Sequence, residues 1–541
     1  MDVGRLLRTV RYLKPVQVYG RLGARLPKPG PKLGAPPQTR ALERPCAAWA
    51  PREPSLVGPT RARFIGEAAD FAGAASWNDP ARPRLWLYNL HYFDDLTADG
   101  GAESQAWRRG MVARWIAENP PGAGAGWEPY PTALRIVNWI KWALAGQATA
   151  PDWLHSLAIQ TRWLADRLEW RLLGNHLMAD IKALIFAGLY FDGPEADAWL
   201  ARGLALHRAQ LAEQVLSDGG HFERSPMYHA IMLEDLLDLI NFGEASGAVD
   251  AGTLAHWGVV ADRMGAWLKV MTHPDGEVGL FNDAASGIAA TPAALEAYTG
   301  RLGRAPVAAA ALSIIRLDPS GYVRLTHGDG VALIDVAPIG PDYLPGHAHA
   351  DTLSFELSLG GERLVVNGGT STYAEGAQRQ LERATVSHST VEVDDGDSSE
   401  VWAGFRVGRR ARVRDLLVRE DGAAVQVSAA HDGYAWRPGR PLHRRAWRMT
   451  NSRLTVTDLI QGRCDKAVAR FHLGPGVVAR ADADQLSGDL TTLAGRTVRW
   501  TSSAPARVEP SEWRPRFGER LEIMQLTIPL AAAPLVTEFT W

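Results

Sequence analysis

The sequence predicts a multidomain protein in which an all-α half precedes an antiparallel all-β half. From about residue 60 to 310, apolar residues recur at helical spacing. After about residue 315 the chain changes to short alternating runs separated by Gly, Asp and Asn turns, which is typical of antiparallel strands. Because the two kinds of element are segregated along the chain, we expect separate α and β domains rather than a mixed α/β sheet.

Length and composition exclude several classes of protein. A chain of 541 residues suggests three or four domains at about 150 residues each. With 58 Lys and Arg against 60 Asp and Glu, it lacks the basic surplus of a general nucleic-acid binder. Two cysteines exclude a disulfide framework, and no uncharged apolar run is long enough to predict a membrane span. The 20 tryptophans hint at stacking on sugar rings.

Residues 1–60 form a basic, proline-punctuated leader. They contain 11 Lys and Arg, 3 Asp and Glu, and 10 of the 34 prolines. We expect a basic helix and an extended arm that wrap the main body, with attachment to an anionic membrane surface or glycan as the alternative. The segment has no apolar core or cleavage site of a signal peptide, which predicts a cytoplasmic protein, with periplasmic location or secretion by another route left open.

Three segments of the α half show clear helical spacing. They are residues 126–146, 176–191 and 225–242, each preceded by polar, Gly or Pro residues that can start a helix. Short connections predict antiparallel helix pairs. In the β half, residues 322–339, 353–370 and 453–460 alternate with strand period and are bounded by turns.

Two clusters of chemically capable residues belong to the α half. Asn175 and His176 stand at the start of a helix, where backbone donors and the positive end of the helix dipole favour an anion, although Asn is also an ordinary helix cap. In the second cluster, Glu223 and Arg224 lie in a turn that leads into a helix carrying Tyr228 in its first turn. A tyrosine placed there can exchange protons with a ligand or can be structural.

A third cluster opens the β half. His347 and His349 alternate along an extended segment, so that both can face one site, and Asn367, Tyr373 and His388 follow. A His-x-His pair with a later histidine is moderately suggestive of a metal, but the sequence offers no third strong ligand.

Together these segments resemble the heparinase II/III-like family of polysaccharide lyases. The resemblance rests on the motifs GNHL, SPMYH, GHAHADTLSFEL, VSHSTVEVDDGD, HDGYAWRPGRPLHRR and FHLGP, in the family's order over roughly residues 85 to 475. It implies an incomplete (α/α) toroid followed by an antiparallel β-sandwich. The expected domains are therefore the leader 1–60, a toroid over 61–312 and a heparinase II/III-like β-sandwich over 313–541.

The resemblance also implies β-elimination on a uronic acid residue, which gives a 4,5-unsaturated product. Asn175 and His176 match the positions that hold the substrate carboxyl group. Tyr228 matches the catalytic tyrosine that protonates the leaving oxygen, and His347 matches the histidine that acts as the base or supports it. A basic role for Tyr228 would require neighbours such as Arg224 or His229 to lower its pKa.

Further sugar contacts are expected from Arg224, Tyr373, His229, Trp127 and Glu223, and Trp139 is a second expected sugar platform. The expected partner is an anionic polysaccharide, and the sequence sets no oligomeric state.

The chemistry requires no cofactor. His349 and His388 match positions where family members bind a structural zinc ion. The third ligand is often Asp, whereas this sequence has Asn367, a weaker ligand that makes zinc doubtful. Ala179 is a second departure, because an acidic residue is common there and the acidic residue is instead Asp180.

Two other functions remain open at this stage. A uronate C5-epimerase of the same fold, acting in exopolysaccharide biosynthesis, would form the same carbanion and reprotonate it without losing the 4-oxygen. A non-catalytic glycan-binding protein is the other alternative, although pure binding has no need of a proton-transferring tyrosine. A glycosidase is less well supported because no pair of carboxylates dominates the clusters.

Overall fold

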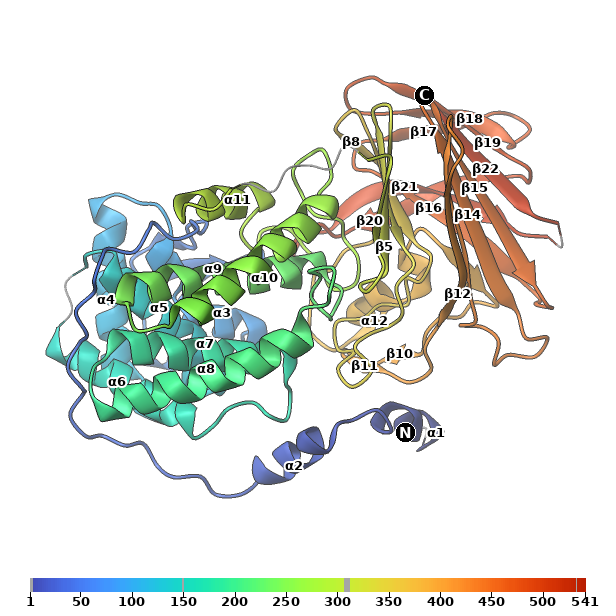
Figure 1. Ribbon diagram of the computed structural model, residues 1–541. Coiled ribbons are helices and arrows are strands. Elements are labelled where there is room, and N and C mark those ends of the chain that lie inside the picture. The colour runs from blue at the N-terminus through green and yellow to red at the C-terminus, as the bar shows by residue number, and fades with distance from the viewer. Residues whose placement is uncertain (1–2, 148–149, 306–311, 532) are drawn as a thin grey trace.

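The computed structural model describes residues 3–147, 150–305, 312–531 and 533–541. A helical half and a β half lie side by side, and the N-terminal segment passes along the outside of the helical half (Figure 1). The predicted order of an all-α half followed by an all-β half is therefore confirmed.

The helical half is built from long helices joined by short connections. In chain order the helices are α1 Val3–Val10, α2 Pro15–Gly23, α3 Arg84–Tyr92, α4 Ala102–Glu118, α5 Pro129–Leu144, α6 Pro151–Ala165, α7 Gly174–Tyr190, α8 Pro194–Gln214, α9 Pro226–Ser246, α10 Ala251–Val270 and α11 Pro292–Arg301, with a short α12 Ala377–Arg383 in the β half.

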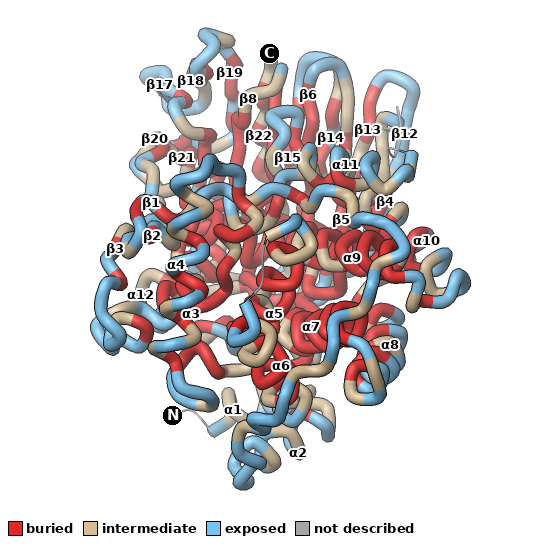
Figure 2. The backbone as a smooth tube through the Cα atoms, turned by 90° about the vertical axis from the view of Figure 1, so that its left-hand side faces the viewer, coloured by how far each residue is buried: buried red, intermediate tan, exposed pale blue. Residues whose placement is uncertain are grey.

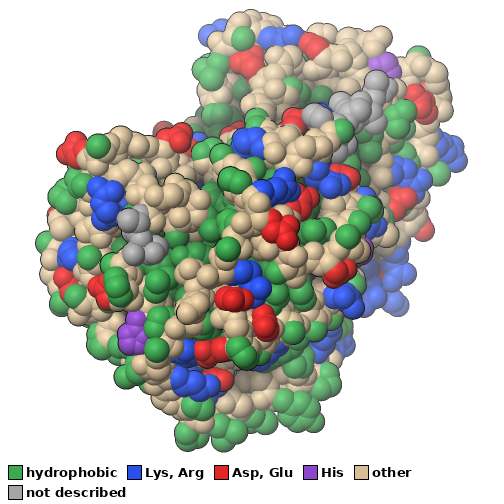
Figure 3. All heavy atoms as spheres, turned by 60° about the vertical axis from the view of Figure 1, so that its left-hand side comes forward, with side chains coloured by type: hydrophobic (Ala, Val, Ile, Leu, Met, Phe, Trp, Pro, Cys, Tyr) green, Lys and Arg blue, Asp and Glu red, His purple; other side chains and the backbone are tan. Residues whose placement is uncertain are grey.

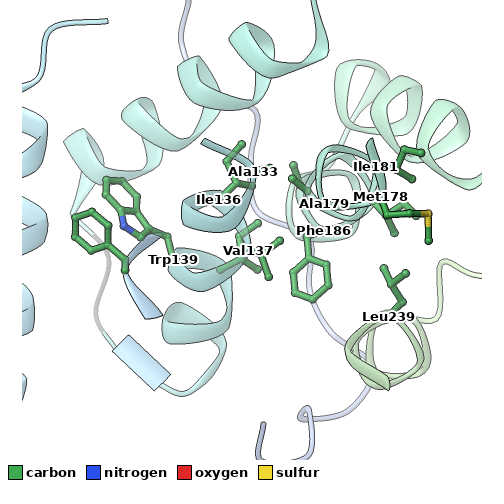
Figure 4. Close-up of a cluster of buried hydrophobic side chains, with 14 of the residues drawn as sticks. Ala133, Ile136, Val137, Trp139, Met178, Ala179, Ile181, Phe186 and Leu239 are labelled. Carbon is green, nitrogen blue, oxygen red and sulfur yellow. The ribbon is translucent and has the colours of Figure 1, made fainter. Parts of the chain in front are cut away.

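Helices α5, α7 and α9 are inner helices, and α6, α8 and α10 pack around them, with exposed residues along α8 and α10 (Figure 2). Ile136 and Val137 of α5, Phe186 of α7 and Leu239 of α9 belong to one buried cluster (Figure 4). Helix α8 approaches α7 closely because a side chain at Gly188 would lie 2.6 Å from the backbone of Leu200. Inner helices wrapped by outer ones form the predicted incomplete (α/α) toroid.

The strands of the β half fall mainly into two antiparallel sheets. One sheet contains β4 Ile314–Leu317, β5 Tyr322–His327, β6 Gly330–Asp335, β7 Phe355–Leu359, β8 Glu362–Val366, β9 Val391–Val393, β16 Ala467–Leu473, β20 Arg507–Trp513 and β21 Leu521–Pro529. The other contains β12 Val413–Glu420, β13 Val425–His431, β14 Leu442–Thr450, β15 Arg453–Gln461, β17 Val478–Ala481, β18 Ser487–Thr491, β19 Thr497–Ser502 and β22 Leu535–Thr540. A small pair is formed by β10 Val401–Trp402 and β11 Arg406–Val407.

The two large sheets enclose one hydrophobic core, which makes this half a β-sandwich. The strand orders are β20-β21-β16-β8-β7-β6-β5-β4, with β9 beside β16, and β12-β13-β14-β15-β22-β19-β18-β17. Phe355 and Phe471 of the first sheet pack with Trp447 and Phe539 of the second. Alternating side chains of both sheets supply this core, which explains the period-2 pattern of the sequence.

A small sheet that the sequence pattern did not predict precedes the toroid helices. It consists of β1 Leu56–Gly58, β2 Arg61–Phe64 and β3 Glu67–Asp70. Ala62 and Ala69 are buried, and the ring of Phe64 packs edge-on against Trp86 of α3. These strands are too short to give a periodic signal, and they fall at the end of the predicted leader and the start of the predicted toroid.

The leader lies along the outside of the body. The backbone amide of Arg40 donates to Tyr190 at the end of α7, and that of Glu43 donates to Ala245 in α9. Farther upstream, α1 reaches the β half, where Arg8 pairs with Glu400. Within the described residues, no helix combines the length and the apolar character needed to cross a bilayer.

Candidate active site at the junction of the two halves

A strained turn places Asn175 and His176 at the start of α7. Leu173 and Gly174 both have positive φ, at 64° and 55°. A side chain at Gly174 would lie 2.4 Å from Leu344 and 2.8 Å from Glu223, so the turn fits only glycine. His176 is the one residue of α7 that is not buried. The turn therefore presents the first residues of the helix to the junction with the β half.

Two residues, Glu169 and Tyr130, fix the orientation of the His176 ring. Its Nδ1 lies 2.7 Å from Glu169 Oε2, and its face stacks on Tyr130 with 4.4 Å between ring centroids. Burial acts to raise the pKa of Glu169, but the hydrogen bond from His176 and nearby Arg171 lower it, so this carboxylate stays ionised. Asp180 accepts the Glu169 backbone N–H at 2.7 Å. The acidic residue beside Ala179 thus supports the turn that holds His176.

Tyr228 is set in the first turn of α9 by a helix cap. Ser225 Oγ accepts the Tyr228 backbone N–H at 3.2 Å, and Pro226 begins the helix. The Tyr228 hydroxyl is 3.0 Å from the Tyr373 hydroxyl, and its ring stacks on His347 with 4.0 Å between centroids. Residues from the helical half and the β half therefore meet at this tyrosine.

The pKa of Tyr228 is shifted in the direction that suits an acid rather than a base. Burial raises its pKa well above the usual value, and Tyr373 adds to this shift. Arg224 does not oppose the shift, because its Nε donates to the Ser320 carbonyl at 3.0 Å. The hydroxyl is therefore protonated at neutral pH, and the lowering of its pKa that a basic role would require from Arg224 or His229 does not occur.

His347 is oriented by a buried carboxylate that the sequence did not single out. Its Nδ1 is 2.9 Å from Asp283 Oδ2, while Asp283 Oδ1 is 2.8 Å from His349 Nε2. Arg379 forms a two-pronged ion pair with the same carboxylate, with Nη2 2.6 Å from Oδ2. Burial acts to raise the pKa of Asp283, but Arg379 and the two histidines hold it well below its usual value. An ionised Asp283 is an acceptor for the Nδ1 proton of His347, so Nε2 is the ring nitrogen that faces away from this carboxylate.

Glu223 is the acidic residue nearest to the other ring nitrogen of His347, Nε2. Its Oε2 lies 3.5 Å from that nitrogen, and the backbone N–H of Asn175 lies on the other side of this carboxyl group. Burial raises the pKa of Glu223, which favours the neutral acid. A buried acid beside a histidine can share a proton with it or donate to a bound anion.

Three of the predicted sugar contacts are buried in the core of the helical half. His229 is fully buried, and its ring nitrogens meet the backbone of His221 and Met264 at 3.2 and 2.9 Å. Trp127 is 3% exposed and donates to the Asn119 carbonyl, and Trp139 is fully buried. His229, Trp127 and Trp139 are therefore core residues, and their prediction as sugar contacts is wrong.

Arg224 also turns away from the site. Besides Ser320, its guanidinium meets the Phe222 carbonyl, and it lines a separate pocket with Pro338–Asp342 and Arg410–Arg412. Its φ of 59° rotates the side chain away from its neighbour Glu223. The sequence alone gave no sign of this left-handed residue.

The residues proposed for zinc do not fit a metal. His349 Nδ1 and His388 Nε2 lie 3.2 Å apart, but His349 Nε2 faces Asp283. The Asn367 amide is occupied, because its Oδ1 accepts from Ser389 and its Nδ2 donates to Ser354, both at 3.2 Å. No group of three His, Cys, Asp or Glu side chains suited to a metal occurs in the described part of the chain. A neutral, already bonded amide is a poor third ligand.

We expect purified protein to contain no stoichiometric zinc. Elemental analysis of the full chain after dialysis against zinc-free buffer measures this directly. One zinc ion per chain that disappears in His388→Ala would contradict the expectation.

Some residues of the site carried no usable signal in the sequence. Asp283 lies in a Gly- and Ala-rich turn after α10, and Arg379 lies in α12, between the GHAHADTLSFEL and VSHSTVEVDDGD motifs but outside both. Tyr130 belongs to a stretch that identified a helix but not a site. Only the folded chain brings them to His347 and His176.

Comparison with known proteins connects this geometry to a family. The model of the heparinase II/III N-terminus matches residues 104–300, and that of the heparinase II/III-like C-terminal region matches residues 311–541. Together the two matches cover most of the chain, including every residue described above at the junction.

Individual relatives share between a quarter and a third of their aligned residues with this chain. FtsZ-localized protein C of Caulobacter vibrioides is 28% identical over 455 residues, which cover 78% of this chain and 73% of the relative. Heparin-sulfate lyase of Bacteroides stercoris is 25% identical over 271 residues, or 46% of this chain and 40% of the lyase. A crystal structure of heparinase III superposes with a TM-score of 0.67 at 18% identity, covering 88% of this chain and 79% of that one, which is a likeness of fold.

Proposed function

This chain belongs to the heparinase II/III-like family of polysaccharide lyases, and we propose that it cleaves a uronic-acid-containing polysaccharide by β-elimination. The observation that carries the proposal is that His347 packs against Tyr228 on one side and lies beside Glu223 on the other, and that Glu223 also lies against the Gly174–Asn175 turn. Tyr228, His347 and this turn each supply a function that the elimination needs.

The substrate carboxylate must be stabilised first. The hydrogen on C5 is weakly acidic because it is α to the carboxylate, and its removal places negative charge on that group. Asn175 is a donor at a helix N-terminus, where the dipole also favours negative charge, and His176 stands next to it with its Nδ1 held by Glu169. Glu223, whose pKa is raised by burial, lies against the same turn.

His347 and Tyr228, whose rings pack against each other, then carry out the two proton transfers. His347 has its Nδ1 proton held by Asp283, so its Nε2 lone pair takes the C5 proton. The C5–H electron pair forms the C4–C5 double bond as the bond from C4 to its oxygen breaks. Tyr228, kept protonated by its burial, donates its proton to the departing oxygen. No water is consumed, and the product is a 4,5-unsaturated uronate.

A panel of uronic-acid polysaccharides tests this proposal. Heparan-type polymers, hyaluronan, alginate and bacterial exopolysaccharides are incubated with the full chain, and ultraviolet absorbance reports the conjugated enoate. We expect absorbance to rise with at least one polymer. A silent panel accompanied by exchange of the C5 hydrogen with solvent would contradict elimination and indicate an epimerase. A silent panel with polymer binding alone would indicate a glycan-binding protein.

The similarity to FtsZ-localized protein C makes this assay necessary, because the name of that relative describes a location and no reaction.

A further inference from the structure

Exposed hydrophobic side chains are concentrated in residues 3–33. Of the twenty large hydrophobic side chains that are exposed in the described chain, nine lie in this segment. Large apolar side chains scattered singly over a surface are ordinary, whereas a cluster indicates a surface that is covered by something. We call residues 3–33 the apolar arm.

Helix α1 turns its polar side toward the protein and its apolar side outward. Val3, Leu7 and Val10 follow helical spacing, and Leu7 is 62% exposed. On the inner side, Arg8 Nη2 lies 2.8 Å from Glu400, and Thr9 accepts a hydrogen bond from Trp402 at 3.1 Å. The polar contacts thus fix the helix with its apolar side facing away from the body.

Helix α2 repeats this arrangement. Its inner side is held by Gln17, which is buried and donates to the Tyr343 carbonyl at 3.1 Å. Gly20 also packs so closely that a side chain there would lie 2.8 Å from the backbone of Arg171. The outer side carries Tyr19 and Leu22, which are 70% and 56% exposed. The apolar side of α2 is therefore held outward by contacts on its other side.

Both helices lie at the same end of the molecule. They form its lower end in Figure 2, and the lowest part of the surface is largely hydrophobic in Figure 3, which shares the same vertical axis. This end projects beyond the toroid, so a flat surface can reach both helices together.

The charge of the arm selects its partner. Residues 3–33 contain eight Lys and Arg and no Asp or Glu. Four of these cations pair with carboxylates of the body, namely Arg5 and Arg8 with Glu400, Lys14 with Glu213 and Lys32 with Asp166. Arg21 lies in the last turn of α2, Arg25 lies two residues beyond the end of this helix, and both are exposed. Apolar side chains flanked by basic residues on short helices are the features of a segment that lies in a lipid–water interface.

We propose that the apolar arm docks the protein onto an anionic lipid surface, with the outer sides of α1 and α2 inserted among the acyl chains and Arg21 and Arg25 at the headgroups. The two helices have eight and nine residues, so they lie on the membrane and do not cross it. This inference is independent of the reaction at the junction.

Co-sedimentation of the full chain with lipid vesicles tests the docking. Vesicles of equal parts phosphatidylcholine and phosphatidylglycerol are compared with pure phosphatidylcholine. We expect binding to the anionic vesicles that weakens with salt. The double variant Leu7→Glu/Leu22→Glu is expected to lower the partition coefficient at least about tenfold, because it removes two inserted side chains and adds repulsive charge.

Leu493→Glu is the matched control, since Leu493 is 76% exposed in the turn after β18 and lies outside the arm. It should bind as the wild type does, and all variants should keep the wild-type melting temperature and absorbance activity. Arg21→Glu/Arg25→Glu should remove much of the salt-sensitive part of binding.

Three results would overturn the proposal. They are no binding of the wild type to anionic vesicles, unchanged binding of Leu7→Glu/Leu22→Glu, or an equal loss in Leu493→Glu. Self-association that the double variant abolishes, without vesicle binding, would show that the arm pairs with a second copy instead. Loss of lyase activity in the panel would not affect these outcomes.

Discussion

Tyr228→Phe is expected to reduce formation of the unsaturated product by about a hundredfold to ten-thousandfold, the usual contribution of a positioned proton-transfer group. The substitution removes one hydroxyl and keeps the ring that stacks on His347 at 4.0 Å. The measurement is the initial rate of absorbance increase on the best polymer of the panel, at saturating substrate.

Tyr373→Phe is the matched control for this loss. It breaks the same 3.0 Å hydrogen bond between the two hydroxyls but leaves the Tyr228 hydroxyl in place. Both variants should therefore lose similar stability, about 1 kcal/mol for one hydrogen bond, while Tyr228→Phe loses far more activity. Equal rates for the two variants, or an undiminished rate in Tyr228→Phe, would contradict the role of Tyr228 as the acid.

Asp283→Asn is expected to lower both stability and activity. The substitution leaves the Arg379 guanidinium buried without its charge partner, and breaking a buried ion pair in this way lowers the free energy of unfolding by about 3–5 kcal/mol. It also removes the acceptor that fixes the Nδ1 proton of His347, so the folded variant should react more slowly with little change in KM. Urea unfolding and steady-state kinetics measure the two effects.

The stability difference should depend on pH in a defined direction. The native pKa of Asp283 is held well below its usual value of about 3.9, so its stabilising charge is fully present above that pH. As the pH falls below about 4, protonation of the carboxylate removes this contribution from the wild type, whereas the amide introduced by Asp283→Asn does not titrate. The difference between wild type and variant should therefore shrink on acidification, and a difference that grows would contradict this assignment.

Asp458→Asn separates the structural effect from the catalytic one. Asp458 is a buried carboxylate in the β-sandwich that pairs with Arg445 and His443, both at 2.7 Å, and its pKa is lowered to about 2. It thus resembles Asp283 in partners but has no contact with His347. We expect Asp458→Asn to lose similar stability and to keep the turnover of its folded fraction. An equal fall in turnover would show that Asp283 acts only through the fold.

The sequence predicted the two-part architecture because periodicity reports which face of each element is buried. The spacing of apolar residues in α5, α7 and α9 and the alternation in strands such as β7 and β15 are direct records of the core. Short strands such as β1–β3 contain too few residues to show a period, and they were missed.

Within the site, local motifs identified residues whose position depends on one helix start or one loop. Asn175, His176 and Tyr228 each follow a turn or cap that is encoded within a few residues. The same reasoning failed for Trp127 and His229, because their exposure depends on elements distant in sequence that pack over them. Residue type alone cannot separate a core aromatic ring from one at a surface.

The sequence by itself determined the family, the order of the domains and the candidates for the acid and the base. Only the tertiary structure decided that Asp283 and Arg379 orient the candidate base, that burial keeps Tyr228 protonated, and that Asn367 is occupied by Ser354 and Ser389. The physical reason is that a motif is local, whereas burial and charge pairing depend on residues brought together from about a hundred positions away.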